Sequence, residues 1–242
     1  MKLLHTCWLV DSWKPSREKY LRAWGDAGWH VVLWDMGQLG RTPLDGVELL
    51  NAEPLMHASE VADAFAFEMR HRAHMCAADL FRFVVLHELG GSYADLDILP
   101  KNARAADAWP LFGQPQGCKP ANQIPAFGRP HTAELAAESL EIRFVSSPKA
   151  HPLIARITAA QALNEHKFAV SGGYLTHGID QIVLRTGPML VAAVARGYAM
   201  EVRQPYTDFL IQGATVDATP ENDKEHMTLR YPEMLRLAKG GS

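Results

Sequence analysis

The sequence predicts an α/β fold in which helices cover a largely parallel β-sheet. Residues 3–10 form a continuous apolar run of strand length, as in a strand that is buried on both faces. A helix is expected next, because Pro15 suits a first helical turn and Gly28 ends an apolar pattern at helical spacing. Residues 30–34 form a second strand-like run. A strand, a helix and a strand within about 35 residues are typical of a βαβ unit, whose strands lie parallel.

The same patterns predict the elements that follow. Glycine, proline and polar residues indicate a loop over 36–54, and helical character resumes over 58–68. Residues 74–89 are compatible with a helix throughout, and Gly90 suits its C-terminal cap. Beyond it we expect strands over 91–99 and 143–146, helices over 152–163 and 190–194, a short strand over 199–202, and a flexible polar tail over 219–242.

Length and composition limit the class of protein. At 242 residues we expect a single domain over 1–242, and the 48% hydrophobic and 21% charged residues are those of an ordinary globular protein. The net charge of −3 provides no positive field for nucleic acid, and three cysteines without a CxxC pair indicate no disulfide framework. No apolar run reaches the roughly 18 to 20 residues of a membrane span. We therefore expect a soluble, cytoplasmic protein, with secretion as an effector left open.

Two acidic residues, Asp95 and Asp97, are candidates for a metal site. They flank Leu96 in a segment expected to be extended, where residues two apart project from the same face. Two aligned carboxylates repel each other, and Mg²⁺ or Mn²⁺ beside a phosphate-bearing ligand would remove that repulsion. An Asp-x-Asp sequence on its own is more often a solvated turn, so its context decides the interpretation.

The helix before this pair supplies that context. Asp79 and Arg82 are three residues apart and therefore share a helical face. They fit a surface ion pair, but they also fit a cleft in which the aspartate accepts hydrogen bonds from hydroxyl groups and the arginine balances a phosphate or orients a sugar. Spacing alone does not separate these two interpretations. Gly90 and Gly91 would let the backbone turn sharply between the helix and the acidic pair.

These residues together resemble a known composite motif. Residues 77–82, Ala-Ala-Asp-Leu-Phe-Arg, and 86–97, Leu-His-Glu-Leu-Gly-Gly-Ser-Tyr-Ala-Asp-Leu-Asp, are similar to the DXD sugar-binding region of retaining glycosyltransferases. The similar groups are the family-32 mannosyltransferase-like enzymes and the catalytic domains of large clostridial glucosylating toxins. Their pattern is Asp-x-x-Arg on a helix, then Leu-x-x-x-Gly-Gly-x-Tyr-x-Asp-x-Asp. Every fixed position of that pattern is filled here.

The resemblance covers residues 3–194, apart from a stretch of little similarity over 102–140. Trp8 is similar to the tryptophan that ends the first strand in these families and stacks on the nucleotide base, although a tryptophan there also fits a core aromatic. Residues 34–35 resemble the end of the family's second strand. Residues 147–152 resemble its small-Pro-x-x-His-Pro turn, and 185–188 contain its Thr-Gly-Pro.

The resemblance implies a GT-A-like α/β domain with a Rossmann-type nucleotide-binding half and a mixed central sheet. It implies metal-dependent, retaining transfer of a sugar from a nucleotide-diphospho-sugar, with UDP favoured over GDP, to a saccharide or protein acceptor. Asp95 and Asp97 would hold Mn²⁺ or Mg²⁺, with Asp95 also near the ribose. Asp79 and Arg82 would bind the donor sugar, and Tyr93 would support the nucleotide or its phosphates. Polysaccharide biosynthesis and modification of a host protein both remain open.

The chain departs from the family-32 pattern in two places. Arg143 and Phe144 stand where a small polar residue usually precedes the turn at 147–152. The C-terminal His-x-x-x-x-Ser-Trp ending is absent, which leaves His226 as the nearest candidate for a third metal ligand and Asn222 as a weaker one. A single histidine in a charged tail is more often exposed to solvent.

Other chemistries fit the sequence less well. His71, His74, Cys76 and His87 lack the spacing of a zinc site, and Ser92 lacks the strand-then-helix order of a hydrolase nucleophile. A phosphotransferase of the haloacid-dehalogenase type also binds Mg²⁺ through Asp-x-Asp, but its motif directly follows an apolar strand. A non-catalytic nucleotide-sugar-binding module stays open, because loss of one acceptor-side residue would leave every motif intact.

Overall fold

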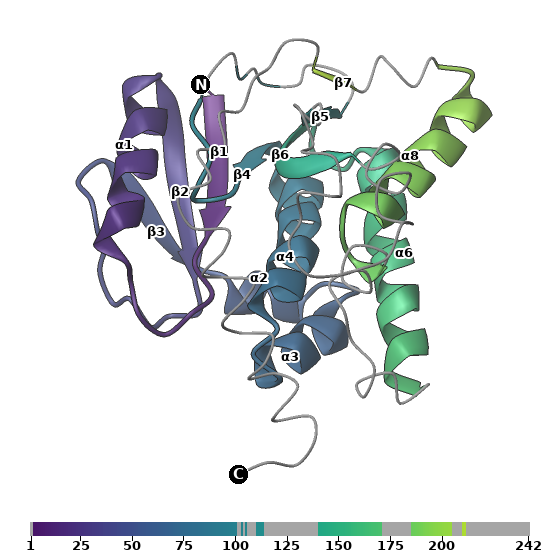
Figure 1. Ribbon diagram of the computed structural model, residues 1–242, viewed down its shortest axis with the longest axis horizontal. Coiled ribbons are helices and arrows are strands. Elements are labelled where there is room, and N and C mark those ends of the chain that lie inside the picture. Colours follow the sequence, from purple (N-terminus) through teal and green to yellow (C-terminus); the bar gives the residue numbers. More distant parts are fainter. Residues whose placement is uncertain are drawn as a thin grey trace, which may run out of the picture.

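One mixed β-sheet organises the chain, seen here in a computed structural model that describes residues 2–100, 103, 105, 110–113, 140–170, 185–204 and 210–211. Within these residues the sheet has seven strands in the order β3-β2-β1-β4-β6-β5-β7 (Figure 1). The strands are β1 (Lys2–Cys7), β2 (Trp29–Asp35), β3 (Val47–Asn51), β4 (Gly91–Ala94), β5 (Leu111–Gly113), β6 (Glu141–Ser147) and β7 (Leu210–Ile211). The predicted α/β class and mixed central sheet are confirmed.

The strand directions create a switch point between β1 and β4. Strand β1 lies parallel to β2 on one side and to β4 on the other, and β3 extends the parallel part beyond β2. Strand β6 is antiparallel to both β4 and β5. Because the chain moves outward from β1 to β3 and then returns to the other side of β1, the carboxyl ends of β1 and β4 flank a position where open α/β sheets bind ligands.

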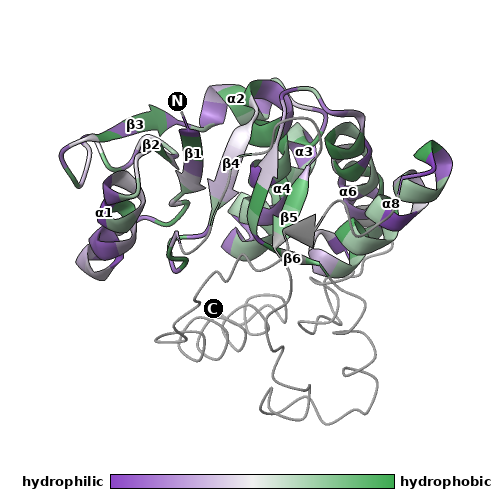
Figure 2. Cartoon of the chain, turned by 90° about the horizontal axis from the view of Figure 1, so that it is seen from above, coloured by the Kyte–Doolittle hydropathy of each residue, from purple (hydrophilic) through white to green (hydrophobic). Residues whose placement is uncertain are grey.

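Helices cover both faces of the sheet. They comprise a short 3₁₀ helix η1 (Pro15–Arg17) and the α-helices α1 (Glu18–Asp26), α2 (Glu53–His57), α3 (Ala62–Arg70), α4 (His74–Leu89), α6 (Pro152–Val170) and α8 (Pro188–Val202). Helix α1 and helix α2 lie on opposite sides of the sheet (Figure 2). Strand β2 shows why both faces need cover: Leu33 packs in a cluster with α1, whereas Val32 and Trp34 pack in the cluster that includes α4.

Helix α4 is the central helix of the fold. Ten of its sixteen residues are buried, so it is enclosed nearly all round rather than presenting one apolar face to the sheet. Its predicted bounds are confirmed, and Gly90 caps its end with φ of 70°. The polar side chains on this helix therefore lie in the interior, where each of them needs a partner.

Several predicted elements differ from the structure. Strand β1 ends at Cys7 rather than at residue 10, and β3 occupies part of the predicted loop over 36–54. The predicted helix over 58–68 begins only at residue 62, as α3, and a separate short helix, α2, lies before it and overlaps the end of the predicted loop. Helix α6 continues to Val170, and residues 199–202, predicted as a strand, belong to α8. The tail over 219–242 lies outside the described residues.

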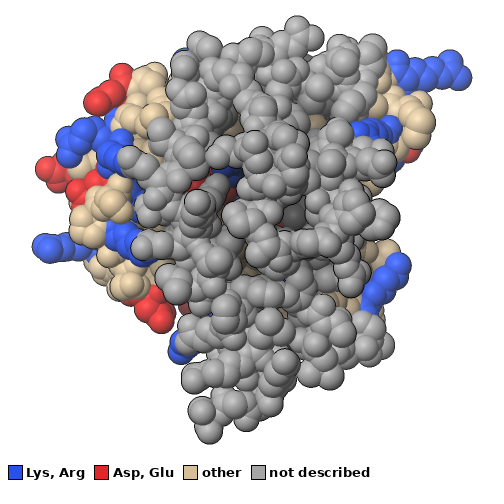
Figure 3. Space-filling model, viewed as in Figure 1, with Lys and Arg blue, Asp and Glu red and all other residues tan. Residues whose placement is uncertain are grey.

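Charged side chains of both signs are interspersed on the side of the molecule that carries α1 (Figure 3). Lysine and arginine are therefore not separated from aspartate and glutamate on this side. Among the described residues, no helix combines the length and the apolar character that crossing a membrane requires.

Candidate active site

The candidate site lies at the switch point of the sheet. Trp8 directly follows β1, and Asp95 directly follows β4, so both residues stand at the carboxyl ends of adjacent parallel strands. The backbone N–H of Asp95 donates to the carbonyl of Arg143 at 2.9 Å, which ties the end of β4 to β6. Helix α4 leads directly into β4, and therefore brings its own polar residues to the same place.

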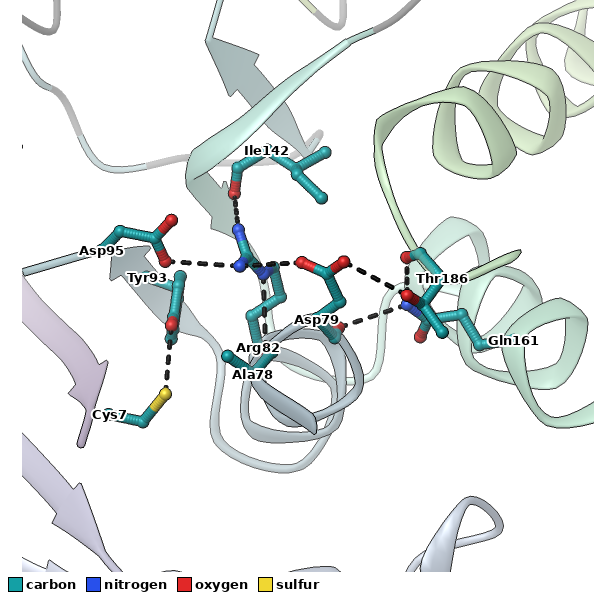
Figure 4. A network of polar contacts seen from close by, with 9 residues as sticks. All are labelled: Cys7, Ala78, Asp79, Arg82, Tyr93, Asp95, Ile142, Gln161 and Thr186. Atoms are coloured by element: carbon teal, nitrogen blue, oxygen red, sulfur yellow. Dashed lines mark hydrogen bonds and ion pairs between the residues drawn. The ribbon is translucent and has the colours of Figure 1, made fainter. Parts of the chain in front are cut away.

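Arg82 is the centre of the polar network (Figure 4). Its Nη2 lies 2.9 Å from Oδ1 of Asp79 and 3.3 Å from Oδ1 of Asp95. Its Nη1 donates to the carbonyl of Ile142, and its Nε donates to the carbonyl of Ala78 at 3.4 Å. Four of its five N–H groups can thus be assigned to protein acceptors. The shared helical face predicted for Asp79 and Arg82 is confirmed, but their ion pair is buried rather than exposed.

Asp79 is held from the opposite side by α6 and the segment before α8. The hydroxyl of Thr186 donates to Oδ2 of Asp79 at 3.2 Å. The side-chain amide of Gln161 donates to the backbone carbonyls of Asp79 and Thr186, at 3.2 Å and 2.7 Å. Both carboxylate oxygens of Asp79 therefore have protein partners, and the side chain has a single well-determined orientation.

Burial sets the protonation of this pair. Asp79 is only 7% exposed, and the loss of solvation raises its pKa to about 6 although the charge of Arg82 acts in the opposite direction. Burial also disfavours the charge of Arg82, but the carboxylates of Asp95 and Asp79 outweigh it and raise the arginine pKa. Near neutral pH the network consists of two carboxylates around one guanidinium.

The Asp-Leu-Asp segment is a turn, which corrects the prediction of an extended segment over 91–99. Strand β4 ends at Ala94, and the backbone N–H of Ile98 donates to the carbonyl of Asp95 at 3.2 Å. Asp95 and Asp97 are both partly exposed, whereas Leu96 between them is buried. Oδ1 of Asp97 is itself buried, whereas the side chain of Asp95 is 26% exposed. Both carboxylates are oxygen donors of the type that Mg²⁺ or Mn²⁺ prefers.

A complete metal site is not present in the described part of the chain. There, no three side chains among histidine, cysteine, aspartate and glutamate lie together as metal ligands would. The candidate third ligand His226, and the weaker candidate Asn222, lie outside the described residues. Asp95 and Asp97 thus fit part of a site, in which a bound diphosphate and water would complete the coordination.

The glycine pair between α4 and β4 is required by geometry. Gly90 and Gly91 have φ of 70° and 92°, a region that side chains disfavour. A Cβ at Gly90 would lie 2.7 Å from the backbone nitrogen of Lys149, and one at Gly91 would lie 3.0 Å from the carbonyl of Leu3. The predicted sharp turn is confirmed, and it is this turn that places Asp95 next to Arg82.

A buried histidine that sequence reasoning did not single out supports the glycine turn. The indole N–H of Trp34 donates to Nδ1 of His5 at 3.1 Å, so Nε2 carries the proton and donates to the carbonyl of Gly90 at 3.0 Å. Burial lowers the pKa of His5 to about 4, which keeps the ring neutral and this tautomer in place. The position of His5 within an apolar strand did not indicate that it would hold the carbonyl of Gly90.

The two aromatic candidates are more buried than their predicted roles require. Tyr93 is 1% exposed, its hydroxyl lies 3.2 Å from Sγ of Cys7, and its ring centroid lies 4.8 Å from the guanidinium of Arg82. Tyr93 therefore supports Arg82, and the structure leaves it no surface for direct contact with a nucleotide. Trp8 is 7% exposed, packs edge-on against Trp13, and donates from its indole to the carbonyl of Ser12 at 3.0 Å.

A second buried charge cluster lies beside the site. Arg185, directly before Thr186, contacts Glu68 of α3 at 2.9 Å and also pairs with Glu165 of α6. Its Nη2 lies 3.1 Å from Sγ of Cys76. Burial, together with the neighbouring Glu68, raises the pKa of Glu165 to about 8. The sequence gives no signal for this cluster, because Glu68 and Arg185 are 117 residues apart.

The other predicted segments also lie near this part of the fold. Residues 147–152 follow β6, and the backbone N–H of Ala150 donates to the carbonyl of His87 at 2.8 Å. The turn therefore packs against the end of α4, as its contact with Gly90 also shows. Arg143 and Phe144, which depart from the family-32 pattern, lie within β6, and Phe144 stacks on Trp24 in the core.

Comparisons with known proteins agree with this geometry. Residues 41–105 match the family model described as the TcdA/TcdB catalytic glycosyltransferase domain. The fold is similar to that of the PaToxG glycosyltransferase, with a TM-score of 0.60 at 10% identity over 99% of this chain and 78% of that one. It is also similar to the glycosyltransferase domain of the YGT toxin bound to UDP, with a TM-score of 0.58 at 12% identity over 89% of this chain and 80% of that one.

The ligand-free form of the YGT toxin domain aligns in the same way, with a TM-score of 0.56 at 10% identity over 87% of this chain and 79% of that one. A search of curated proteins finds no match. At these identities the structural likeness establishes the fold, and the family match covers the segment that carries Asp79, Arg82, Asp95 and Asp97. The predicted resemblance is thus confirmed: the chain is similar to the catalytic domains of toxin glycosyltransferases.

Proposed function

We propose that this chain transfers a sugar from a nucleotide-diphospho-sugar to a saccharide or protein acceptor. One observation carries the proposal: Arg82 is fixed between Asp79 and Asp95 at the carboxyl ends of the sheet's switch-point strands. These residues lie within the segment that matches a glycosyltransferase family model. The position is the one where open α/β sheets bind nucleotides.

We further propose that the donor is a UDP-sugar. Support comes from the YGT toxin domain, a structural neighbour whose structure is described as bound to UDP. Trp8, at the end of β1, would then lie next to the base. Because Trp8 is buried against Trp13, this contact requires the indole to expose one face when the nucleotide binds. Asp95, at the end of the adjacent strand, would approach the ribose.

In the donor complex, Asp95 and Asp97 would hold Mn²⁺ or Mg²⁺. When bound, the ion supplies positive charge against the negative charge that develops on the leaving diphosphate. The protein's own contribution is orientation. Arg82 holds the carboxylate of Asp95, and Tyr93 limits the movement of the Arg82 guanidinium.

Asp79 would bind hydroxyl groups of the donor sugar. Its carboxylate is oriented by Arg82 and Thr186, and each of its oxygens retains further lone pairs for a hydroxyl donor. Since most N–H groups of Arg82 are already assigned to protein acceptors, we propose that this arginine orients the two aspartates rather than binding the sugar itself. This differs from the direct role that the sequence resemblance implies.

Donor hydrolysis by the purified chain tests the proposal. A panel of UDP- and GDP-sugars is incubated with Mn²⁺, and free sugar and nucleotide are measured, with chelator followed by added Mn²⁺ as the test of metal dependence. We expect hydrolysis of at least one UDP-sugar and loss of at least about 90% of it in Asp97→Asn, which keeps the size of the side chain and removes its charge. Activity in Asp97→Asn equal to that of the unaltered chain would show that this residue is not a metal ligand.

The same panel separates the alternatives. A phosphotransferase of the haloacid-dehalogenase type would release phosphate from a simple aryl phosphate and leave the glycosidic bond of the sugar donor intact. A non-catalytic module would bind UDP-sugar in a thermal-shift assay without any turnover. Retention, which we propose from the resemblance alone, is tested by NMR of the anomeric configuration of the first product formed.

A further inference from the structure

A second arginine reaches the Asp-Leu-Asp turn from the opposite face of the sheet. Arg17 is the last residue of η1, and its Nη1 donates to the backbone carbonyl of Leu96 at 3.0 Å. Leu96 is the residue between the two aspartates, and it packs in the cluster that contains α1 rather than in the cluster that contains α4. Arg82 thus contacts the turn from the α4 side and Arg17 from the α1 side.

The two arginines differ in how their charge is balanced. Arg82 lies between two carboxylates, whereas Arg17, which is 7% exposed, has no carboxylate partner among the described residues. Its Nε, within the same described part of the chain, also has no hydrogen-bond partner. Burial of a guanidinium is costly when its charge is not balanced nearby, so a single carbonyl acceptor is an incomplete environment for it.

The net charge around the Asp-Leu-Asp turn indicates which kind of ligand would balance the charge of Arg17. Three aspartates, at positions 79, 95 and 97, and two arginines, at positions 17 and 82, leave this group with one net negative charge. A divalent cation would make the group positive, and the diphosphate of a donor would then be attracted to it. Arg17 is the member whose charge no described carboxylate has already neutralised.

We propose that Arg17 is a positioning residue for binding of the metal and the diphosphate. It acts through Leu96, whose carbonyl it holds so that Asp95 and Asp97 keep their orientation, and it adds a positive charge on the side of the turn away from Arg82. The inference rests on the proposed function, and it extends the donor site to a residue outside the family-matched segment 41–105.

Trp24 provides a matched control on the same segment. Its indole N–H donates to the carbonyl of Ile98 at 2.9 Å, so it also holds the backbone just after the acidic pair, but without a charge. Trp24 is buried and stacks on Phe144 in the core. Trp24→Phe therefore removes a carbonyl contact and lowers stability, while the charge at the turn is unchanged.

The test measures binding of Mn²⁺ and UDP to the full chain by calorimetry and thermal shift, which requires no turnover. We expect Arg17→Met to weaken binding of UDP in the presence of Mn²⁺ by about tenfold or more, as for loss of a charge-assisted interaction. Arg17→Lys, which keeps the charge and a donor, is expected to bind within about threefold of the unaltered chain. Trp24→Phe is expected to unfold at lower temperature and to bind within the same threefold.

Two results would overturn the inference. Binding by Arg17→Met within threefold of the unaltered chain would show that the charge is not used. An equal loss in Trp24→Phe and Arg17→Met would show that anchoring of the backbone alone matters. If the unaltered chain bound neither Mn²⁺ nor UDP, the proposed function itself would fall, a failure that is distinct because it does not depend on any variant.

Discussion

Replacement of Thr186 by valine tests whether the ionisation of Asp79 depends on the hydrogen bond between them. Thr186 is fully buried, and its hydroxyl donates to Oδ2 of Asp79 at 3.2 Å. Valine has nearly the same shape, so Thr186→Val removes the donor and leaves little change in packing. Thr186→Ser is the matched control, because it keeps the hydroxyl and loses only a methyl group.

The magnitude follows from the geometry of this bond. A hydrogen bond to a charged acceptor contributes about 1.5–3 kcal/mol, and a length of 3.2 Å places this one near 1.5 kcal/mol. One pKa unit corresponds to about 1.4 kcal/mol, so loss of the donor raises the pKa of Asp79 by about one further unit above its present value of about 6. The direction is upward because the hydroxyl stabilises only the charged form.

The assay is urea unfolding of both variants between pH 5 and pH 8. The pKa of Asp79 is raised in the folded state, so its contribution to stability is present at low pH and is lost as the pH rises through the folded pKa. This contribution of Asp79 to the free energy of unfolding is fully lost near pH 6 in the unaltered chain, but only near pH 7 in Thr186→Val. We therefore expect the stability difference between Thr186→Val and Thr186→Ser to grow by about 1.3 kcal/mol from pH 5 to pH 8.

A difference between the valine and serine variants that does not change with pH would refute this reasoning. It would mean that Thr186 contributes packing alone, or that Asp79 does not titrate in this range. If the ionised form of Asp79 binds the donor sugar, the acidic limb of donor hydrolysis moves upward by about the same unit in Thr186→Val.

The remaining predictions concern stability. Glu165 has a pKa raised to about 8 in the fold from an ordinary value of 4.5, so unfolding free energy falls as the pH rises across that interval. Glu165→Gln should remove most of this fall in urea titrations, while Arg185 keeps Glu68 as a partner; an unchanged pH dependence would place the titration elsewhere. Gly90→Ala should cost about 3 kcal/mol or more, because its Cβ would lie 2.7 Å from the nitrogen of Lys149 at a positive φ. A loss below about 1 kcal/mol in the same assay would contradict the backbone geometry.

Local sequence patterns correctly predicted helix α4, which is buried along most of its length. Helix α4 was predicted at its observed bounds, because an unbroken run of helix-compatible residues ends at a glycine with positive φ. Strand β3 was missed because it is short and lies at the edge of the sheet. All of its residues except Val47 are partly or fully exposed, so it has no continuous apolar run. Residues 199–202 have the composition of a strand, but continuation of the helix from Pro188 prevails over that local preference.

Only those parts of the site whose residues lie close together in the sequence could be predicted. Three-residue spacing on a helix predicted the pair of Asp79 and Arg82, and the motif predicted that Asp95 would lie in the same site. Thr186, which contacts Asp79 across 107 residues, could not be assigned this contact because tertiary packing alone brings the two together. Arg17 is a similar case, since its contact with Leu96 spans 79 residues and joins η1 to the turn after β4.

The burial of α4 explains why its site residues are paired before any ligand binds. A helix enclosed on nearly all sides cannot leave Asp79 or Arg82 to water, so each must be satisfied by protein groups in the resting state. Arg82 accordingly contacts the carbonyl of Ile142 and two carboxylates at once. In the proposed function, donor binding would therefore require little rearrangement at Arg82, whereas Asp95 and Asp97 are the partly exposed members of the site. Affinity should therefore respond to groups that orient the turn, whereas changes at Arg82 should affect stability and binding together.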